Sequence, residues 1–358
     1  MKFLRLAFYV LIAQLVLSGC AGEGVEETSS SSSSEINFDA YLGRNASTRS
    51  SETNITSLKG TEPNSGFGVF ARYNHTNGAI SPLMDNEHVT WKEKENRWEY
   101  TNTRYWPNEG TVDFYAFAPY LENVKKLVNA PDSIKDNPTC IEFTSSTSPV
   151  DLVWDVQKNK TVPKSTTDGK VKFQFKHALA RLGFDITANQ ELEEHGAVIQ
   201  VEEVKLYGDT IVNGAFDIKG YLNLENGGWS RPKENTRVVY TWTPTGAEDG
   251  TFKLSASQLD HKCTKIENAP NSYLCIIPQD KYYPFYLQIT YTVQQGDYFQ
   301  EEVTVKKDLL KVLQPGVSNP SFVFVRGKAY VFHLILSLDS IDFSVEHDVY
   351  DWDEVKNG

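Results

Sequence analysis

The sequence predicts an all-β protein, and three features indicate this fold class. Apolar and polar residues alternate in most of the candidate elements, which is typical of antiparallel strands with one buried and one solvated face. Tyr, Phe, Thr and Val, which favour strands, are frequent along the whole chain. Helical spacing is rare: only residues 120–128 and 257–260 have it, so a fold built from βαβ units is disfavoured.

The alternation can be followed from one candidate strand to the next. A slip of one residue interrupts it at Val201/Val204 and again at Tyr286/Ile289, and such a slip is what a β-bulge produces. The other alternating positions are Ile36, Phe38, Ala40 and Leu42; Val171, Phe173 and Phe175; Phe184 and Ile186; and Tyr330, Phe332, Leu334 and Leu336.

The N-terminus has the features of an export signal. Lys2 and Arg5 precede an apolar run, residues 6–17, which is too short to span a bilayer as a helix. Residues 17–20 are Leu-Ser-Gly-Cys, and small residues before a cysteine at this distance resemble the lipobox of a bacterial lipoprotein. We predict a lipoprotein signal peptide at residues 1–19 and a lipid anchor on Cys20. An ordinary signal peptide with a chance cysteine is the alternative.

The remaining chain divides into a tether and two predicted domains. Residues 20–34 are rich in Gly, Glu and Ser and predict a flexible tether. A polar, Lys- and Thr-rich segment, residues 157–169, is interpreted as an inter-domain linker or a long loop beside one. We therefore predict an N-terminal β-sandwich domain at residues 35–165 and a C-terminal one at residues 166–358.

Charge and cysteine content exclude some classes of partner. The formal net charge is −12, and removal of residues 1–19 takes away two basic residues and no acidic one, which leaves −14. No basic stripe offsets this acidity, so nucleic acid is not an expected partner. Cys140, Cys263 and Cys275 lack the spacing of metal ligands. Cys263 and Cys275 either form a disulfide or are separate, half-buried thiols, and the sequence leaves both open.

The sequence contains no recognisable catalytic constellation. The histidines are scattered, and there is neither a phosphate-cradling glycine loop nor a Gly-x-Ser-x-Gly turn, so we expect no metal, no cofactor and no enzyme activity. His177 lies between apolar positions at a strand end and is expected to be a packed, hydrogen-bonded residue. The many Trp and Tyr residues are expected mainly in the core, although some could form a stacking platform for sugars.

Four short segments, in this order, resemble the fimbrillin family of lipoproteins from diderm anaerobes of the gut and mouth. The resemblance extends over nearly the whole mature chain and implies two β-sandwich domains of transthyretin-like, Greek-key topology. The segments are Tyr105-Trp106-Pro107 with residues 112–119, then Asp-Leu-Val-Trp at 151–154, Phe-Lys-His-Ala-Leu-Ala-Arg-Leu at 175–182, and Arg-Gly-Lys-Ala-Tyr at 326–330 leading to Trp352.

The resemblance also implies a maturation switch. An outer membrane lipoprotein precursor, with palmitate or a similar acyl chain on Cys20, is cut by an arginine-specific surface protease. The cut removes the lipid together with the first strand, whose apolar residues are Ile36, Phe38, Ala40 and Leu42. The groove left behind then accepts a strand from another pilin subunit. We favour cleavage after Arg49, because the family commonly has Thr-Arg before a small residue there. Arg44 is the runner-up, and two ordinary surface arginines are the alternative.

The resemblance predicts a pilus (fimbrium) subunit on the cell surface, in a homo- or hetero-polymer. Residues 353–358 are too short for a separate donor strand. Either the pattern Ile341, Phe343 and Val345 is donated, or the subunit only accepts a strand and is a tip or accessory adhesin with a host or glycan ligand.

Two other functions remain open at this stage. The first is a monomeric, surface-anchored glycan-binding lipoprotein, which predicts no cleavage and an exposed row of aromatic residues. The second is a glycoside-acting enzyme, which is disfavoured because no acid/base pair of carboxylates can be placed.

Overall fold

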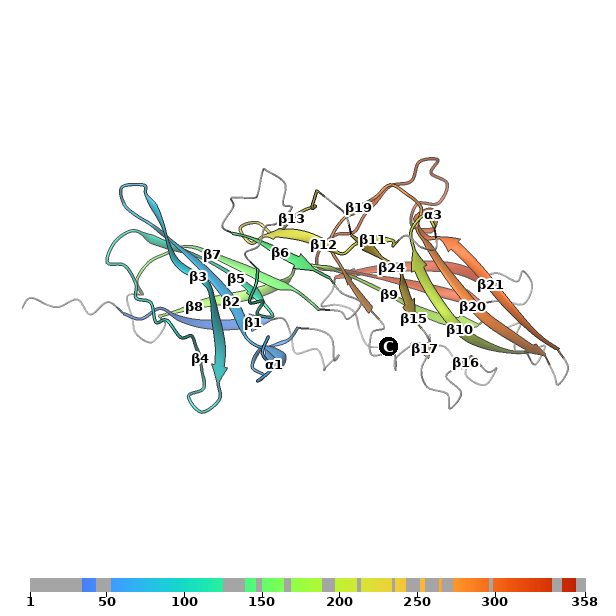
Figure 1. Ribbon diagram of the computed structural model, residues 1–358, viewed down its shortest axis with the longest axis horizontal. Coiled ribbons are helices and arrows are strands. Elements are labelled where there is room, and N and C mark those ends of the chain that lie inside the picture. Colours follow the sequence, from blue (N-terminus) through green and yellow to red (C-terminus); the bar gives the residue numbers. More distant parts are fainter. Residues whose placement is uncertain are drawn as a thin grey trace, which may run out of the picture. The chain divides into compact units, whose positions relative to one another are not determined.

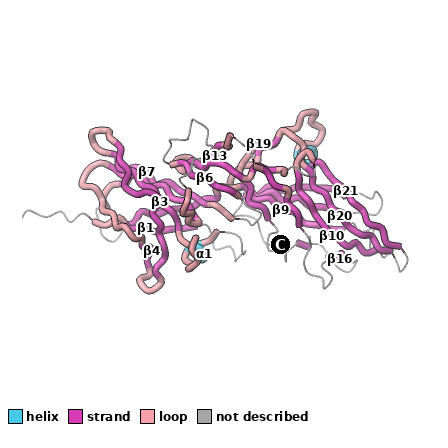
Figure 2. The backbone as a smooth tube through the Cα atoms, viewed as in Figure 1, coloured by secondary structure: helices cyan, strands magenta, loops and turns pink. Residues whose placement is uncertain are grey.

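Strands make up nearly all of the regular structure, as Figure 2 shows, and this confirms the predicted all-β class. The computed structural model describes residues 34–42, 53–124, 139–145, 150–163, 169–188, 197–210, 214–233, 236–242, 252–254, 264–265, 273–295, 299–336 and 343–351. All of them belong to one compact unit, Ser34–Gly358.

The largest sheet has seven strands in the order β1-β8-β7-β5-β2-β3-β4, with β1 at one end (Figure 1). β1 and β8 are parallel, and the other pairs are antiparallel. The strands are β1 (Asn37–Leu42), β2 (Phe67–Asn74), β3 (Ile80–Lys92), β4 (Arg97–Glu99), β5 (Thr111–Ala118), β7 (Val153–Lys160) and β8 (Lys170–His177).

Each face of this sheet supports a separate apolar core. On β5, Phe114 and Ala116 point into one core, while Tyr115 and Phe117 point into the other, as the period of two requires. The first core also holds side chains from β1, β2, β4 and β8. Because β1 and β4 contact each other although they lie at opposite ends of the strand order, the sheet curls around this first core.

The second core is shared with a three-stranded sheet. Ile141 and Phe143 on one of its strands and Leu222 on another pack with Tyr115, Phe117 and Trp154. The chain therefore buries both faces of β5. The three strands, in sheet order, are β13 (Gly228–Ser230), β12 (Lys219–Asn223) and β6 (Cys140–Thr144).

Two five-stranded sheets enclose a third core, with Val204, Ile289 and Phe332 among its buried residues. The first sheet has β15 (Tyr240–Trp242), β10 (Ala197–Tyr207), β20 (Tyr286–Gln295) and β21 (Phe299–Asp308), with β16 (Phe252–Leu254) beside β10. The second has β17 (Thr264–Lys265), β9 (Ala180–Ala188), β23 (Lys328–Leu336) and β24 (Phe343–Asp351), with β18 (Tyr273–Ile276) beside β9.

Short elements complete the fold. Two two-stranded sheets pair β11 (Phe216–Asp217) with β14 (Arg237–Val238), and β19 (Asp280–Lys281) with β22 (Phe322–Val323). The described helices are α1 (Ile55–Leu58), capped by the Asn54 side chain, and α3 (Leu309–Leu313), capped by Asp308. Of the segments with helical spacing, residues 122–124 form a turn, and residues 125–128 and 257–260 lie outside the described residues.

The first large sheet continues past the proposed domain boundary between residues 165 and 166. β7 precedes this boundary and β8 follows it, yet the two strands pair, with Val153 opposite His177. The polar segment 157–169 therefore includes the end of β7 and leads into β8. Its composition indicates a surface connection between neighbouring strands, and the chain leaves this sheet only after His177.

One of the two predicted bulges is confirmed and the other is wrong. The pairing of β10 with β20 shifts register between Val201 and Glu203, as the slip in alternation predicted. On β20, by contrast, Leu287, Ile289 and Tyr291 are buried in unbroken alternation, and Tyr286 is partly exposed. A tyrosine can cover the edge of a core with its ring while its hydroxyl meets water, so Tyr286 was wrongly placed inside.

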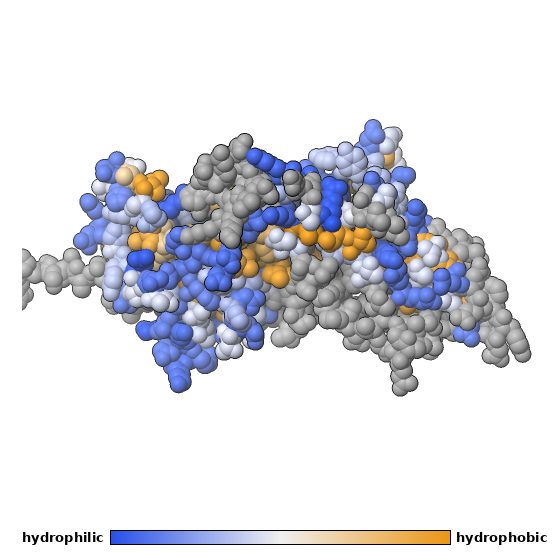
Figure 3. All heavy atoms as spheres, in the orientation of Figure 1, coloured by the Kyte–Doolittle hydropathy of each residue, from blue (hydrophilic) through white to orange (hydrophobic). Residues whose placement is uncertain are grey.

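On the face seen in Figure 3, hydrophilic residues cover most of the described surface. Within the described residues, no helix is long and apolar enough to cross a membrane.

Cys140 is a buried free thiol, and burial raises its pKa to about 11, so it stays protonated. Cys275 is buried on β18, while Cys263 lies outside the described residues.

Candidate functional site

The first strand completes the large sheet at one end. Along Asn37–Leu42 it pairs in parallel with β8, so that Phe38 lies opposite Val171 and Ala40 opposite Phe173. This contact joins two segments that are far apart in the sequence. The site consists of β1 and the groove that β1 fills, and we call this groove, without the strand, the β1 groove.

Phe38 is the central side chain in the β1 groove. It is 1% exposed. Its ring stacks on Phe173 with centroids 5.7 Å apart, and it meets the edges of Phe114 at 5.9 Å and Phe67 at 6.3 Å. Aromatic rings at these separations attract one another beyond the effect of area burial. The floor of the groove is therefore aromatic and shaped for a ring.

Two other apolar side chains from this segment, Ile36 and Leu42, are buried in the same core as Phe38. Ala40 is only partly buried, and Tyr41 is 57% exposed. Burying a large apolar side chain contributes about 1.5–3 kcal/mol. The three buried residues thus make the segment 36–42 an integral part of the core, although β1 is an end strand.

A second segment, residues 100–106, holds the start of this strand from the other side. Ile36 N donates to Arg104 O at 2.8 Å, and Trp106 N donates to Ser34 O at 3.0 Å. The Tyr100 hydroxyl donates to Ile36 O at 2.8 Å. Burial raises the pKa of Tyr100, so this hydroxyl stays protonated and remains a donor. Residues 34–36 are therefore held by backbone and side-chain bonds together.

The chain is fixed again just beyond the segment 43–52. Thr53 N donates to Asp151 Oδ2 at 3.1 Å, and Thr53 Oγ1 donates to the Asp151 carbonyl. The Asp151 carboxylate is fully buried, and its other oxygen lies 2.9 Å from His177 Nδ1. Asp151 thus joins Thr53 to the end of β8. His177 is packed and hydrogen-bonded, as the sequence predicted.

The remaining predicted site residues fall into two groups. Cys20, Arg44, Arg49 and Ile341 lie outside the described residues. Phe343 and Val345 belong to β24, which pairs with β23 within the same chain; Val345 lies opposite Leu334. β24 is an end strand of its sheet.

Comparison with known proteins agrees with this architecture. The family model described as fimbrillin-like matches residues 48–352. The chain belongs to the fimbrillin-like family. No curated protein sequence matches this chain. The family match begins after β1, so the β1 groove is inside the matched region while the strand that fills it is not.

Three solved structures are similar to this fimbrillin-like chain. A fimbrial protein from Bacteroides vulgatus has a TM-score of 0.59 and 20% identity, covering 89% of this chain and 99% of that one. A putative cell adhesion protein from Bacteroides uniformis has 0.47 and 16%, with coverage of 89% and 98%. The tip fimbrial protein Mfa3 from Porphyromonas gingivalis, truncated at its C-terminus, has 0.39 and 12%, with coverage of 80% and 93%. The first of these likenesses shows a shared fold.

Sequence reasoning missed two parts of the site. The sequence did not predict that Tyr100 holds the chain before β1, nor that Asp151 holds it after β1. The segments that contain Tyr105-Trp106 and Asp151 did resemble family segments, which was the available signal. Their roles depend on contacts with Ile36 and Thr53, which are distant in the sequence and cannot be predicted from a local pattern.

Proposed function

We propose that this chain is a pilus subunit, exported as a lipoprotein through Cys20 and cut after Arg49. The cut removes β1 with the lipid, and a strand from another subunit then fills the β1 groove. The processed subunit becomes part of a fimbrium on the cell surface. Its role there is structural or adhesive, without catalysis. Membership of the fimbrillin-like family supports the coarse role.

One observation carries the strand-exchange part of the proposal. β1 is an end strand, yet it contributes Phe38 and Leu42 to the core, and Ile36 directly before it is buried there too. Its loss would leave an apolar groove, an unpaired edge on β8 and backbone groups of residues 104–106 without partners. Such an edge is a strong template for an added strand.

The anchor at Thr53 favours cleavage before that residue. Asp151 holds Thr53 by two hydrogen bonds, so a chain that starts at Ser50 keeps its new terminus attached to the sheet. Cleavage after Arg44 would have the same effect with a longer free end. In both cases β1 leaves and α1 stays.

The donor strand comes from another subunit. In this chain β24 is the candidate donor, since it is an end strand and, among the described strands, pairs with β23 alone. If this subunit only accepts a strand, β24 stays paired and the subunit occupies a tip or accessory position.

Capture of a labelled peptide tests the proposal. The full-length acylated protein in detergent is cut with an arginine-specific protease in the presence of a fluorescent peptide of residues 34–42. We expect the cut protein to retain the peptide in size-exclusion chromatography. A peptide with Phe38→Ser is the matched control and should not be retained, because it cannot fill the aromatic floor of the groove.

Variants locate the cut. If the cut falls after Arg49 alone, Arg49→Ala abolishes capture and Arg44→Ala leaves it unchanged, whereas the reverse result would place the cut after Arg44. Equal capture by uncut protein, or no capture after complete cleavage, would overturn strand exchange and leave the anchored glycan-binding lipoprotein as the function to pursue.

A further inference from the structure

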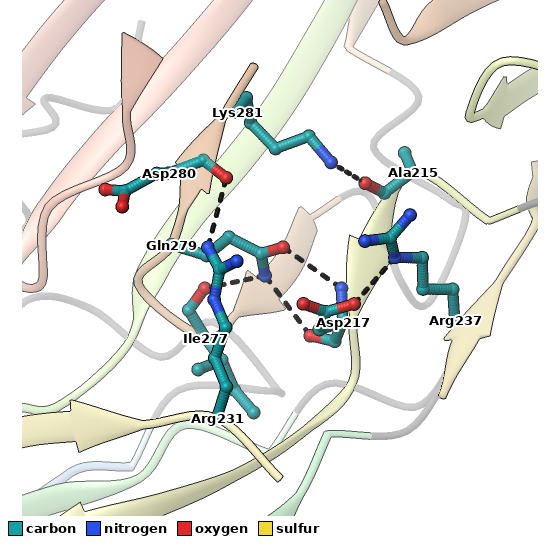
Figure 4. A network of polar contacts seen from close by, with 8 residues as sticks. All are labelled: Ala215, Asp217, Arg231, Arg237, Ile277, Gln279, Asp280 and Lys281. Atoms are coloured by element: carbon teal, nitrogen blue, oxygen red, sulfur yellow. Dashed lines mark hydrogen bonds and ion pairs between the residues drawn. The ribbon is translucent and has the colours of Figure 1, made fainter. Parts of the chain in front are cut away.

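A polar pocket is lined by residues of β11, β14 and β19, among others, and Figure 4 shows the polar contacts of several of them. Its volume is ≈ 590 Å³. Small-molecule sites generally have about 300–1,000 Å³. Charged and aromatic side chains line it, among them Asp217, Arg231, Arg237, Lys281, Tyr282 and Tyr283.

Asp217 supplies a buried acceptor without a partner. Its Oδ1 accepts from Arg237 Nε at 2.6 Å. Its Oδ2 is buried and has no hydrogen-bond partner among the described residues. The Gln279 side chain fixes the backbone of Asp217 by accepting from its N–H at 3.1 Å and donating to its carbonyl at 3.2 Å. A buried acceptor left unpaired is costly, so this oxygen is a place for a hydroxyl donor.

Three cations line the same pocket. Arg231 Nη2 donates to Asp280 O at 3.2 Å, and Arg237 uses only Nε for Asp217, so both guanidinium groups keep nitrogens for another acceptor. Lys281 is buried, donates to Ala215 O and lies 5.0 Å from the Phe216 ring. Burial, followed by the charge of Arg237, lowers the pKa of Lys281 to about 8. The pocket therefore holds three basic side chains beside the carboxylates of Asp209, Asp217 and Asp280, which also line it.

Two tyrosines stand exposed at the pocket. Tyr282 is 62% exposed and Tyr283 73% exposed. The Tyr282 hydroxyl donates to Asp280 Oδ2 at 3.1 Å, which fixes that ring. Aromatic side chains of this exposure, next to one polar pocket, are typical of a binding surface.

We propose that this pocket binds an acidic sugar residue, whose carboxylate pairs with Arg231 and Arg237, whose hydroxyl donates to Asp217 Oδ2, and whose ring covers Tyr283. Guanidinium groups suit a planar carboxylate because they bind it through two parallel hydrogen bonds. The proposal goes beyond strand exchange and does not depend on it, since the pocket contains no residue of the β1 groove.

Other ligand classes fit the same residues less well. A neutral sugar satisfies Asp217 but leaves the remaining nitrogens of the two guanidinium groups without an acceptor. A metal ion lacks ligands, because no three His, Cys, Asp or Glu side chains of the described residues lie together. A polyanion such as nucleic acid is opposed by the net charge of −12.

Glycan binding by the full chain is the test. The panel contains oligosaccharides that end in uronic or sialic acids, each beside its neutral counterpart, and affinities are measured by titration calorimetry. We expect at least one acidic glycan to bind more tightly than its neutral counterpart. Arg231→Gln and Tyr283→Ala should each weaken it by at least about tenfold, as the loss of a charged pair or a stacking face predicts.

Two matched variants control for charge and exposure. Arg97→Gln on β4 and Tyr41→Ala on β1 remove an exposed arginine and an exposed tyrosine outside the pocket, and should leave binding unchanged. If no acidic glycan on the panel binds better than its neutral counterpart, the proposal is wrong. Equal effects of the pocket and control variants would also overturn it.

Discussion

Phe38 on β1 and Phe173 on β8 stack with their ring centroids 5.7 Å apart and their planes inclined by 22°. Both rings are buried. The stack forms only because β1 returns to pair with a strand from much later in the sequence. It therefore reports directly on whether β1 occupies its groove.

Replacing Phe38 should destabilise the uncut protein far more than replacing its exposed neighbour. Phe38→Ala removes a ring that touches Phe67, Phe114 and Phe173, and a buried Phe→Ala change typically costs about 3–5 kcal/mol. Tyr41→Ala should change the free energy of unfolding by no more than about 0.5 kcal/mol. Urea unfolding of residues 20–358 measures both. Similar values for the two variants would show that β1 does not contribute to the core.

The junction at Asp151 makes a second prediction. Asp151→Asn keeps the shape of the side chain but removes the charge that accepts from Thr53 N and contacts His177. We expect a loss of about 1–3 kcal/mol in the free energy of unfolding, with faster hydrogen exchange at the Thr53 amide.

Asp39→Asn is the matched control. Among the described residues, Asp39 accepts only a local bond from Ala40 N, so its amide variant should resemble wild type in both measurements. An unchanged exchange rate at Thr53 in Asp151→Asn would contradict the anchoring role.

The lowered pKa of Lys281 predicts that the free energy of unfolding depends on pH. Its folded-state pKa is about 8, against an ordinary 10.5. Below the lower value the lysine is protonated in both states. Between the two values the unfolded chain binds a proton that the folded protein has lost, so the free energy of unfolding rises with pH.

The Lys281→Met variant isolates this contribution. The difference in unfolding free energy, wild type minus Lys281→Met, should increase between about pH 8 and 10.5 and stay constant below that window. Tyrosines that titrate at high pH affect both proteins and cancel in the difference. Parallel pH profiles would show that Lys281 titrates normally.

Local patterns predicted the strands, because burial on one face fixes the period. Val171, Phe173 and Phe175 are buried as expected, and the slip at Val201 marks a real register shift. Which strands become neighbours depends on distant segments. The parallel pair of β1 with β8, and the pairing of β7 with β8 across the polar segment 157–169, could not be read from composition.

The sequence indicated the strand that fills the β1 groove but not the polar pocket around Asp217. The first strand was predicted from alternation and from the resemblance, because its pattern is local. The pocket was not foreseen, since Asp217, Arg237 and Lys281 come from separate short strands that only the fold brings together. A buried lysine and aspartate look like ordinary surface residues in a sequence.

Mass spectrometry of the N-terminus, on protein recovered from its native cell envelope, distinguishes the cleaved subunit from the anchored lipoprotein. Cleavage as proposed gives a chain that starts at Ser50, or at Asn45 if Arg44 is used, and carries no lipid. A start at acylated Cys20 in all of the material would contradict it.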